Sequence, residues 1–381
     1  MADEENAYSF TTSATHHLKL HGPGQDGFPL WRGGSLPELT LAYECWGELS
    51  AAKDNAIIIF TGLSPSAHAA SSAADPSPGW WEYMIGPGKA VDTNRFFVVC
   101  ANSLGGCHGT TGPSSIDPAT GTPYGAEFPD ITVEDIAASG YHLMRALGVA
   151  RVHAAIGSSM GGMSSIAYGL QFPDAVDYVI SISAAVSALP LTIALRSLQR
   201  ELIRSDPDWN HGRYTDERKP LNGMSLARKL GLVSYRAADE WNQKFDRSRM
   251  PPEKRQQGQF GREFEIENYL EYNAQKFIHS FDPNSYLYLS RSMDWFDIAE
   301  HGDSLADGMA KLEVKRALVI GVTSDILFPA RQQREIADLM RATDTDVEFV
   351  EIDSANGHDA FLIDDAHFSP VVKKFLDESV A

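Results

Sequence analysis

Short apolar runs alternate with amphipathic segments along most of the chain, and this alternation limits the folds that the chain can adopt. The runs have the β-branched content of buried strands and lie at residues 39–46, 56–60, 95–101, 152–157, 177–183, 316–321 and 347–352. Helical spacing of apolar residues follows at 131–149, 160–172, 329–342 and from about Pro370. Strands that are apolar throughout and separated by helices indicate an α/β fold with a mostly parallel sheet covered on both faces.

Residues 184–308 do not continue this alternation. The segment is helix-like, rich in Arg, Asp, Tyr and Trp, and has no strand pattern. We therefore expect a core domain formed by residues 1–183 and 309–381, with residues 184–308 inserted as a helical lid. The lid is expected over the carboxyl edge of the sheet, where ligands bind in open α/β folds.

Charge and hydropathy exclude several classes of partner. The formal net charge is −19, whereas nucleic acids and anionic membranes are bound by basic surfaces. No apolar run approaches the roughly 18 residues that suggest a membrane-spanning helix. The first residues, MADEENAYSF, lack the apolar region of a signal peptide. We expect a cytoplasmic protein that binds neither nucleic acid nor membrane.

Cysteine and histidine do not form the patterns of disulfide frameworks or metal sites. Cys45, Cys100 and Cys107 are few and irregularly spaced. His16 and His17 are adjacent, so they cannot converge on a metal ion as a pair one helical turn apart would. We therefore expect no bound metal ion and no bound cofactor.

Two loops attract attention for their composition. Residues 105–112, GGCHGTTG, follow a strand but lack the glycine spacing of a dinucleotide-binding turn, so we expect a loop that shapes the pocket. Residues 64–79 are rich in Ala, Ser and Pro but too short for a disordered domain. This second stretch is expected to be a loop on the substrate side.

The stretch GSSMGGM, residues 157–163, places Ser159 in a G-x-S-x-G pattern between a predicted strand and a predicted helix. A nucleophile elbow needs this arrangement, because its serine occupies a strained turn in which bulky neighbours would clash. The free N–H groups at the start of the helix then face the charge that develops on a reacting carbonyl. The alternative is a Gly/Ser turn without chemistry.

A serine hydroxyl needs a base, and the chain offers a histidine and an acid in suitable places. Asp325 follows the strand at 316–321, and His358 lies in the loop after the strand at 347–352. The order Ser, Asp, His and the strand-end positions match those of a hydrolase triad. Taken singly, Asp325 could cap the next helix and His358 could be an ordinary loop histidine.

Further motifs carry a resemblance that spans almost the whole chain. The sequence resembles the α/β-hydrolase-fold homoserine/serine O-acyltransferases of methionine and cysteine biosynthesis. The matching runs are residues 78–135, GSSMGGM, FDPNSYLYLSRSMDWFD (281–297), SDILFP and GHDAF. The resemblance implies an α/β-hydrolase fold, an acyl-CoA co-substrate, a Ser-His-Asp acyl-enzyme mechanism and a homodimer that forms through the inserted helices.

The resemblance also implies roles for particular residues. It assigns the triad to Ser159, Asp325 and His358. The backbone N–H groups of Leu63 and Met160 would form the oxyanion hole. Arg200 would contact the amino-acid substrate, and Asp359 would meet its ammonium group.

One departure from the family pattern bears on the substrates. Homoserine acetyltransferases usually read like HALTGDSH after the second strand, whereas this chain has TGLSPSAH at 61–68. With residues 193–209, this favours the branch that acylates L-serine, including the serine O-succinyltransferases. Arg196 could pair with a succinyl carboxylate, since a guanidinium suits a carboxylate, or could be a surface arginine. Acetyl-CoA and succinyl-CoA both remain open as donors.

Three functions therefore compete. The first is a CoA-dependent O-acyltransferase that acts on L-serine, with L-homoserine as the alternative acceptor. The second is a serine esterase or thioesterase with the same triad, which differs only in using water as the second nucleophile. The third is a binding protein of hydrolase-like fold without catalysis, which the presence of all three triad residues in order disfavours.

Overall fold

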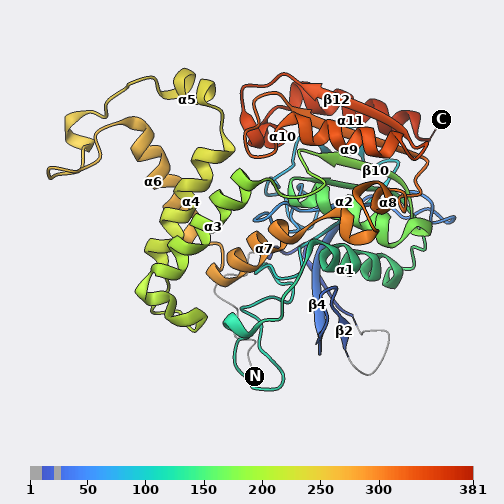
Figure 1. The fold of residues 1–381 in the computed structure, drawn as a ribbon, viewed down its shortest axis with the longest axis horizontal. Coiled ribbons are helices and arrows are strands. Elements are labelled where there is room, and N and C mark those ends of the chain that lie inside the picture. Colours follow the sequence, from blue (N-terminus) through green and yellow to red (C-terminus); the bar gives the residue numbers. More distant parts are fainter. Residues whose placement is uncertain (1–10, 21–26, 381) are drawn as a thin grey trace.

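A single eight-stranded sheet forms the centre of the molecule (Figure 1). The computed structural model describes residues 11–20 and 27–380. The strand order is β1 (His16–Leu20), β4 (Leu39–Trp46), β8 (Phe97–Ala101), β5 (Ala56–Phe60), β9 (Val152–Ser158), β10 (Val176–Ile182), β11 (Arg316–Val322) and β12 (Asp346–Ile352). All pairings from β8 to β12 are parallel, whereas β1 pairs antiparallel with β4, and β4 antiparallel with β8. The mostly parallel sheet expected from the sequence is therefore confirmed.

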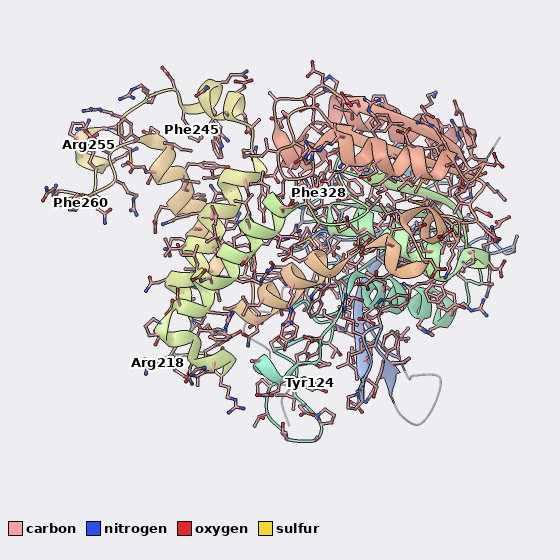
Figure 2. The ribbon with its side chains drawn as sticks, viewed as in Figure 1. Tyr124, Arg218, Phe245, Arg255, Phe260 and Phe328 are labelled. Carbon is pink, nitrogen blue, oxygen red and sulfur yellow. The ribbon has the colours of Figure 1, made fainter. Side chains whose placement is uncertain are left out.

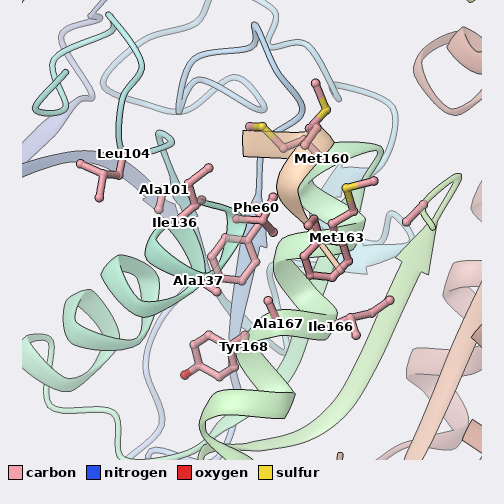
Figure 3. Packing of buried hydrophobic residues seen from close by; sticks show 14 of the residues in the cluster. Phe60, Ala101, Leu104, Ile136, Ala137, Met160, Met163, Ile166, Ala167 and Tyr168 are labelled. Carbon is pink, nitrogen blue, oxygen red and sulfur yellow. The ribbon is translucent and has the colours of Figure 1, made fainter. Parts of the chain in front are cut away.

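Helices cover both faces of the sheet because its strands are apolar on both sides. The helices α1 (Val133–Ala146), α2 (Met160–Gln171) and α9 (Ala330–Arg341) pack on one face, and α11 (Asp365–Glu378) packs on the other. Alternate residues of β5 show this division: Ile58 belongs to the first core and Ile57 to the second. Figure 3 shows Phe60 and Tyr168 among the buried side chains between α1 and α2.

The sequence predicts the start of α1 correctly but not the start of α11, the last helix. Thr132 caps α1 through a capping box with Asp135, as its position before an acidic turn suggests. The last helix, in contrast, begins at Asp365 and not near Pro370. A proline within a helix removes one backbone hydrogen bond and crowds the carbonyl four residues earlier. The buried Phe368 and Val372, however, lie one turn apart on the face that packs against the sheet. Burial of this face outweighs the cost of the proline.

The segment between β10 and β11 is helical. It contains α3 (Pro190–Ser205), α4 (Leu221–Tyr235), α5 (Ala238–Phe245), α6 (Glu265–Ile278), α7 (Pro283–Trp295) and α8 (Leu305–Met309). In Figure 1, α3 to α6 stand to one side of the sheet. We propose residues 184–308 as the lid and the flanking segments as the core.

Short elements complete the fold. Two-stranded ribbons pair β2 (Phe28–Pro29) with β3 (Ser35–Leu36) and β6 (Ile85–Gly86) with β7 (Val91–Asp92), and α10 (Ala360–Ile363) precedes α11. The connection between α5 and α6 projects away from the rest of the molecule, with Phe260 94% exposed (Figure 2). The ends of the central strands, not this projection, carry the expected site.

Candidate active site

Ser159 occupies a sharp turn between β9 and α2. Its backbone has φ 57° and ψ −122°, a strained conformation for a residue with a side chain, and its N–H donates to the Ile182 carbonyl at 2.9 Å. The neighbouring glycines are required by close backbone contacts. A Cβ on Gly157 would lie 2.0 Å from the Gly161 oxygen, and one on Gly161 would lie 2.1 Å from the Phe60 oxygen. The glycines thus let α2 start directly against the ends of two strands.

We expect Gly161→Ala to destabilise the protein by about 2 kcal/mol or to prevent folding, because the Phe60 carbonyl it would strike is fixed in the sheet. Gly169→Ala in the same helix is the matched control. Its Cβ would meet only the end of the Leu312 side chain, and alanine adds helix propensity of about 1 kcal/mol. Urea unfolding of both variants measures the difference. A Gly161 variant as stable as the Gly169 variant would contradict this packing account.

The structure brings Ser159, His358 and Asp325 together. His358 Nε2 lies 2.8 Å from Ser159 Oγ, and His358 Nδ1 lies 2.6 Å from Asp325 Oδ2. The histidine belongs to a turn of 3-10 helix, Gly357–Asp359, after β12, and the aspartate follows β11. Since a carboxylate accepts from Nδ1–H, Nε2 is left as the nitrogen that can accept the serine proton.

Each member of this trio is held in place by further contacts. Asp325 Oδ1 accepts hydrogen bonds from the backbone N–H groups of Leu327 and Phe328, both at 2.8 Å. The Phe328 ring stacks on the His358 ring with centroids 4.9 Å apart. These contacts fix the carboxylate plane and the imidazole, and both side chains are almost fully buried.

The two expected oxyanion donors, Leu63 and Met160, make no backbone hydrogen bond through their N–H groups within the described residues. Met160 is the first residue of α2, so its N–H has no partner within the helix. Across the described residues, neither its N–H nor that of Leu63 donates a backbone hydrogen bond outside regular helices and strands. Leu63 also lines the cavity that contains Ser159. Both groups are available to an oxygen that develops charge there.

A cavity of about 130 Å³ opens over Ser159. This is smaller than the roughly 300–1,000 Å³ of pockets that take drug-sized ligands, so it suits a small acyl group and a small acceptor. Its walls combine backbone of the loop after β5, aromatic rings and arginines. They include Leu63, Ser64, Trp80, Arg196, Gln199, Arg228, Tyr235, Tyr286, Phe328, Asp359 and Leu362.

The positions of two α3 arginines correct one expectation. Arg196 lines the Ser159 cavity, whereas Arg200, which was expected to contact the substrate, lines a separate hollow beside Trp209 and Trp295. Arg196 Nε pairs with Asp294 at 2.6 Å. Its terminal Nη2 is buried and has no hydrogen-bond partner among the described residues, and burial lowers the pKa of this guanidinium.

Sequence reasoning missed two residues of α4. Arg228 and Tyr235 both line the cavity, and their spacing of seven residues puts them on one face of the helix. The Arg228 guanidinium lies 4.3 Å from the centroid of Phe277, and its Nε is buried without a hydrogen bond. In the described part of the chain, Arg228 forms no ion pair with a carboxylate. The arginine–tyrosine spacing was the available signal.

Asp359 lines the cavity as expected but already has a cationic neighbour. Its Oδ2 lies 3.0 Å from Arg236 Nε, and Arg236 Nη1 pairs with Glu240 at 2.6 Å. Burial raises the pKa of Asp359, and the Arg236 charge opposes that rise. A substrate ammonium group would therefore share this carboxylate with Arg236.

The expectation that residues 105–112 shape the pocket also needs correction. Gly109, Thr110 and Thr111 line a different cavity, beside Tyr214 and Asp282. The loop reaches the Ser159 side only through His108, whose Nε2 lies 3.3 Å from the Ser64 carbonyl. It supports the loop that carries Leu63 and does not face the nucleophile.

The substrate-side loop, residues 64–79, is fixed by a buried ion pair. His68 Nδ1 lies 2.8 Å from Glu44 Oε2, and His68 Nε2 lies 3.0 Å from the Ser77 carbonyl. Both partners are acceptors, so these two contacts favour the doubly protonated imidazole, in which both ring nitrogens donate. The His68 carbonyl in turn accepts from the Trp80 N–H at 3.2 Å. This pair connects β4 to the loop and to Trp80, and Ser64 and Pro65 of the loop line the cavity together with Trp80.

We expect this pair to make stability depend on pH. Burial alone lowers the pKa of His68, but its hydrogen bonds to Glu44 and Ser77 raise it above the ordinary value, with a smaller contribution from Asp75. The stabilisation is therefore complete below about pH 6.5, the unfolded value, and is lost as pH rises through the raised folded pKa. Thermal unfolding should show a decline over this window that is absent in His68→Gln. A parallel decline in both proteins would contradict this origin.

Residues 11–20 and 27–380 contain no group of three or more His, Cys, Asp or Glu side chains that could hold a metal ion. Over the same residues, no helix is long and apolar enough to cross a membrane. The chemistry that the cavity offers is that of its serine, histidine, carboxylates and arginines.

Comparisons with known proteins agree with this geometry. Residues 55–365 match the family model described as alpha/beta hydrolase fold. A serine O-succinyltransferase of Litchfieldella anticariensis is 53% identical over 96% of this chain and 99% of its own length. Another, from Frateuria aurantia, is 54% identical over 92% of this chain and 96% of its own length.

Solved structures give the same picture. A homoserine O-acetyltransferase from Bacillus anthracis superposes with a TM-score of 0.87 at 29% identity, covering 96% of this chain and 99% of that one. Esterase E22 superposes with a TM-score of 0.84 at 30% identity, covering 95% and 100%. The fold and site thus define a serine-dependent enzyme of the α/β-hydrolase class. Within that class, the chain belongs to the O-acyltransferase family that includes the serine O-succinyltransferases. The fold, the family and the acyltransferase class predicted from the sequence are confirmed.

Proposed function

We propose that this acyltransferase moves a succinyl group from succinyl-CoA to the side-chain hydroxyl of L-serine through an acyl-enzyme on Ser159. The observation that carries this proposal is the pair of arginines in the cavity, Arg196 and Arg228, each with a buried N–H that lacks a partner in the described part of the chain. A buried guanidinium group with an unpaired N–H is stabilised when an anion binds to it. A succinyl group and an amino acid supply one carboxylate each, whereas an acetyl group supplies none.

The first half of the reaction acylates the enzyme. His358 Nε2 takes the Ser159 proton as Oγ attacks the thioester carbonyl, and the N–H groups of Met160 and Leu63 stabilise the oxyanion by about 3 kcal/mol each. The C–S bond then breaks, and the proton passes from His358 to the CoA sulfur. The small volume of the cavity implies that the rest of CoA extends outside it.

The second half transfers the acyl group. The L-serine hydroxyl gives its proton to His358 and attacks the acyl carbonyl. The bond between the acyl carbon and Ser159 Oγ then breaks, His358 returns the proton to Oγ, and O-succinylserine is released. Water at about 55 M competes, so the acceptor must be positioned; well-oriented groups reach effective molarities of about 10⁵ M or more. Arg228 would hold the serine carboxylate and Asp359 its ammonium group, while Arg196 holds the succinyl carboxylate.

Two other functions use the same trio of residues. Homoserine O-acetyltransferase is favoured by the similarity to the Bacillus anthracis enzyme, and ester hydrolysis by the similarity to esterase E22. Initial rates with succinyl-CoA or acetyl-CoA against L-serine or L-homoserine, with products identified by mass, separate the three. We expect the highest kcat/KM for succinyl-CoA with L-serine. CoA release that is independent of any amino acid would favour the hydrolase.

The surface of the inserted helices supports a homodimer. Leu191 and Leu198 of α3 and Leu226 and Val233 of α4 are about half exposed or more, on helices that pack together. We expect light scattering to give twice the chain mass and Leu226→Glu to give a monomer. A monomeric parent protein at assay concentration would contradict this proposal.

The proposed setting is the cytoplasm. Cys45, Cys100 and Cys107 are free thiols, which agrees with a reducing compartment.

A further inference from the structure

We propose that Arg200 and Asp294 position Arg196, and that this arrangement makes the enzyme prefer a donor whose acyl group carries a carboxylate. The inference rests on the proposed function, because it assumes that Arg196 meets the succinyl carboxylate. Arg200 itself touches no substrate in this account. It acts through Asp294, outside the cavity.

The three side chains form a continuous chain of ion pairs between α3 and α7. Asp294 Oδ1 meets Arg196 Nε at 2.6 Å, and Asp294 Oδ2 meets Arg200 Nη2 at 2.7 Å. Arg200 Nη1 also donates to Ser290 Oγ at 2.9 Å. Arg196 and Arg200 are four residues apart on α3, and Ser290 and Asp294 are four apart on α7. Two adjacent turns of one helix therefore meet two adjacent turns of the other.

Sharing of the aspartate explains why Arg196 keeps a free N–H in the cavity. A carboxylate that faces a single guanidinium usually binds it through both oxygens. Here Oδ2 lies in ion-pair contact with Arg200 Nη2, and the hydrogen bond between Arg196 and Asp294 runs from Nε to Oδ1. Nη2 of Arg196 is left without a hydrogen bond among the described residues. The unpaired Nη2 is the group available to a ligand carboxylate.

The charges of this cluster also favour an anion. Two guanidinium groups share one carboxylate, which leaves one positive charge in excess beside the cavity. Arg196 is only 4% exposed, so water does little to screen that charge. A succinyl carboxylate would neutralise it, whereas an acetyl group would leave it unpaired.

The test replaces Arg200, which frees Asp294 Oδ2 to turn onto Arg196 Nη2. We expect Arg200→Met to lower kcat/KM for succinyl-CoA by about 10- to 100-fold, the range of a lost charged hydrogen bond, and to change kcat/KM for acetyl-CoA less than about twofold. In a ping-pong reaction this ratio reports only acylation, so acceptor binding does not enter. Arg204→Met, one turn further along α3 and lining the same hollow without contacting Asp294, is the matched control.

The outcomes separate this inference from the proposed function. Equal losses with both donors, or no loss with succinyl-CoA, would overturn the positioning role. A parent enzyme that does not use succinyl-CoA would instead overturn the proposed function. If Arg200→Met does not fold, Ser290→Ala removes only the hydroxyl that anchors Arg200, and we expect it to lower succinyl-CoA use selectively by about two- to tenfold. An unselective effect of this milder variant would also count against the inference.

Discussion

Ser159→Ala is expected to lower acyl transfer by about 10⁴-fold or more, because removal of the nucleophile ends the covalent route and leaves only binding and oxyanion stabilisation. Ser159 Oγ is the atom within 2.8 Å of the His358 base. Alanine occupies less space in the turn, so the fold should be retained. CoA release from succinyl-CoA, followed with a thiol reagent at saturating L-serine, gives the rate.

Ser158→Ala is the matched control for this loss. Ser158 is the adjacent serine, and its buried Oγ has no hydrogen-bond partner in the described part of the chain, so its removal leaves no donor or acceptor unpaired. We expect activity within a few-fold of the parent. Similar rates for the two variants, in either direction, would show that the elbow has been assigned to the wrong residue or does no chemistry.

The second large effect concerns the donor. Arg196→Met is expected to lower kcat/KM for succinyl-CoA by about 100-fold, since a charged hydrogen bond to the substrate carboxylate is lost. Asp294 keeps Arg200 as its partner, so the variant does not leave a buried carboxylate without a positive charge beside it. Kcat/KM for acetyl-CoA should change little, because an acetyl group has no carboxylate to bind.

Arg228→Met supplies the opposite pattern. If Arg228 holds the acceptor carboxylate, this variant should lower kcat/KM for L-serine and leave that for succinyl-CoA nearly unchanged. Initial rates over a grid of both substrates give the two ratios for each variant. The account of two separate carboxylate sites would be contradicted if both variants weakened the same substrate.

Local patterns allowed much of the fold to be predicted, and tertiary packing decided the rest. The strands at 39–46 and 56–60 have the predicted bounds because most of their residues are apolar and buried. The edge strand β1, HHLKL, was missed, since most of its side chains are exposed and its pattern is not apolar. The antiparallel direction of β4 could not be predicted either, because the residues of a strand do not indicate its direction relative to its neighbours.

The site divides in the same way. Chain order and strand ends were enough to select Ser159, Asp325 and His358, because the fold places the ends of parallel strands at one edge. Arg196 and Arg200 were both named from the sequence, but which of them lines the cavity was not accessible, since they lie one helical turn apart and both pair with Asp294. Arg228 depends likewise on how α4 packs against the core.

The central claim is that an acyl group on Ser159 passes to an amino-acid hydroxyl in preference to water. Intact-protein mass spectrometry after mixing with succinyl-CoA alone, followed by peptide mapping, measures this most directly. We predict a mass increase of one succinyl group on Ser159, which L-serine discharges as O-succinylserine much faster than it decays to succinate. A label on another residue, or loss of the label as succinate at the same rate with and without L-serine, would contradict the account.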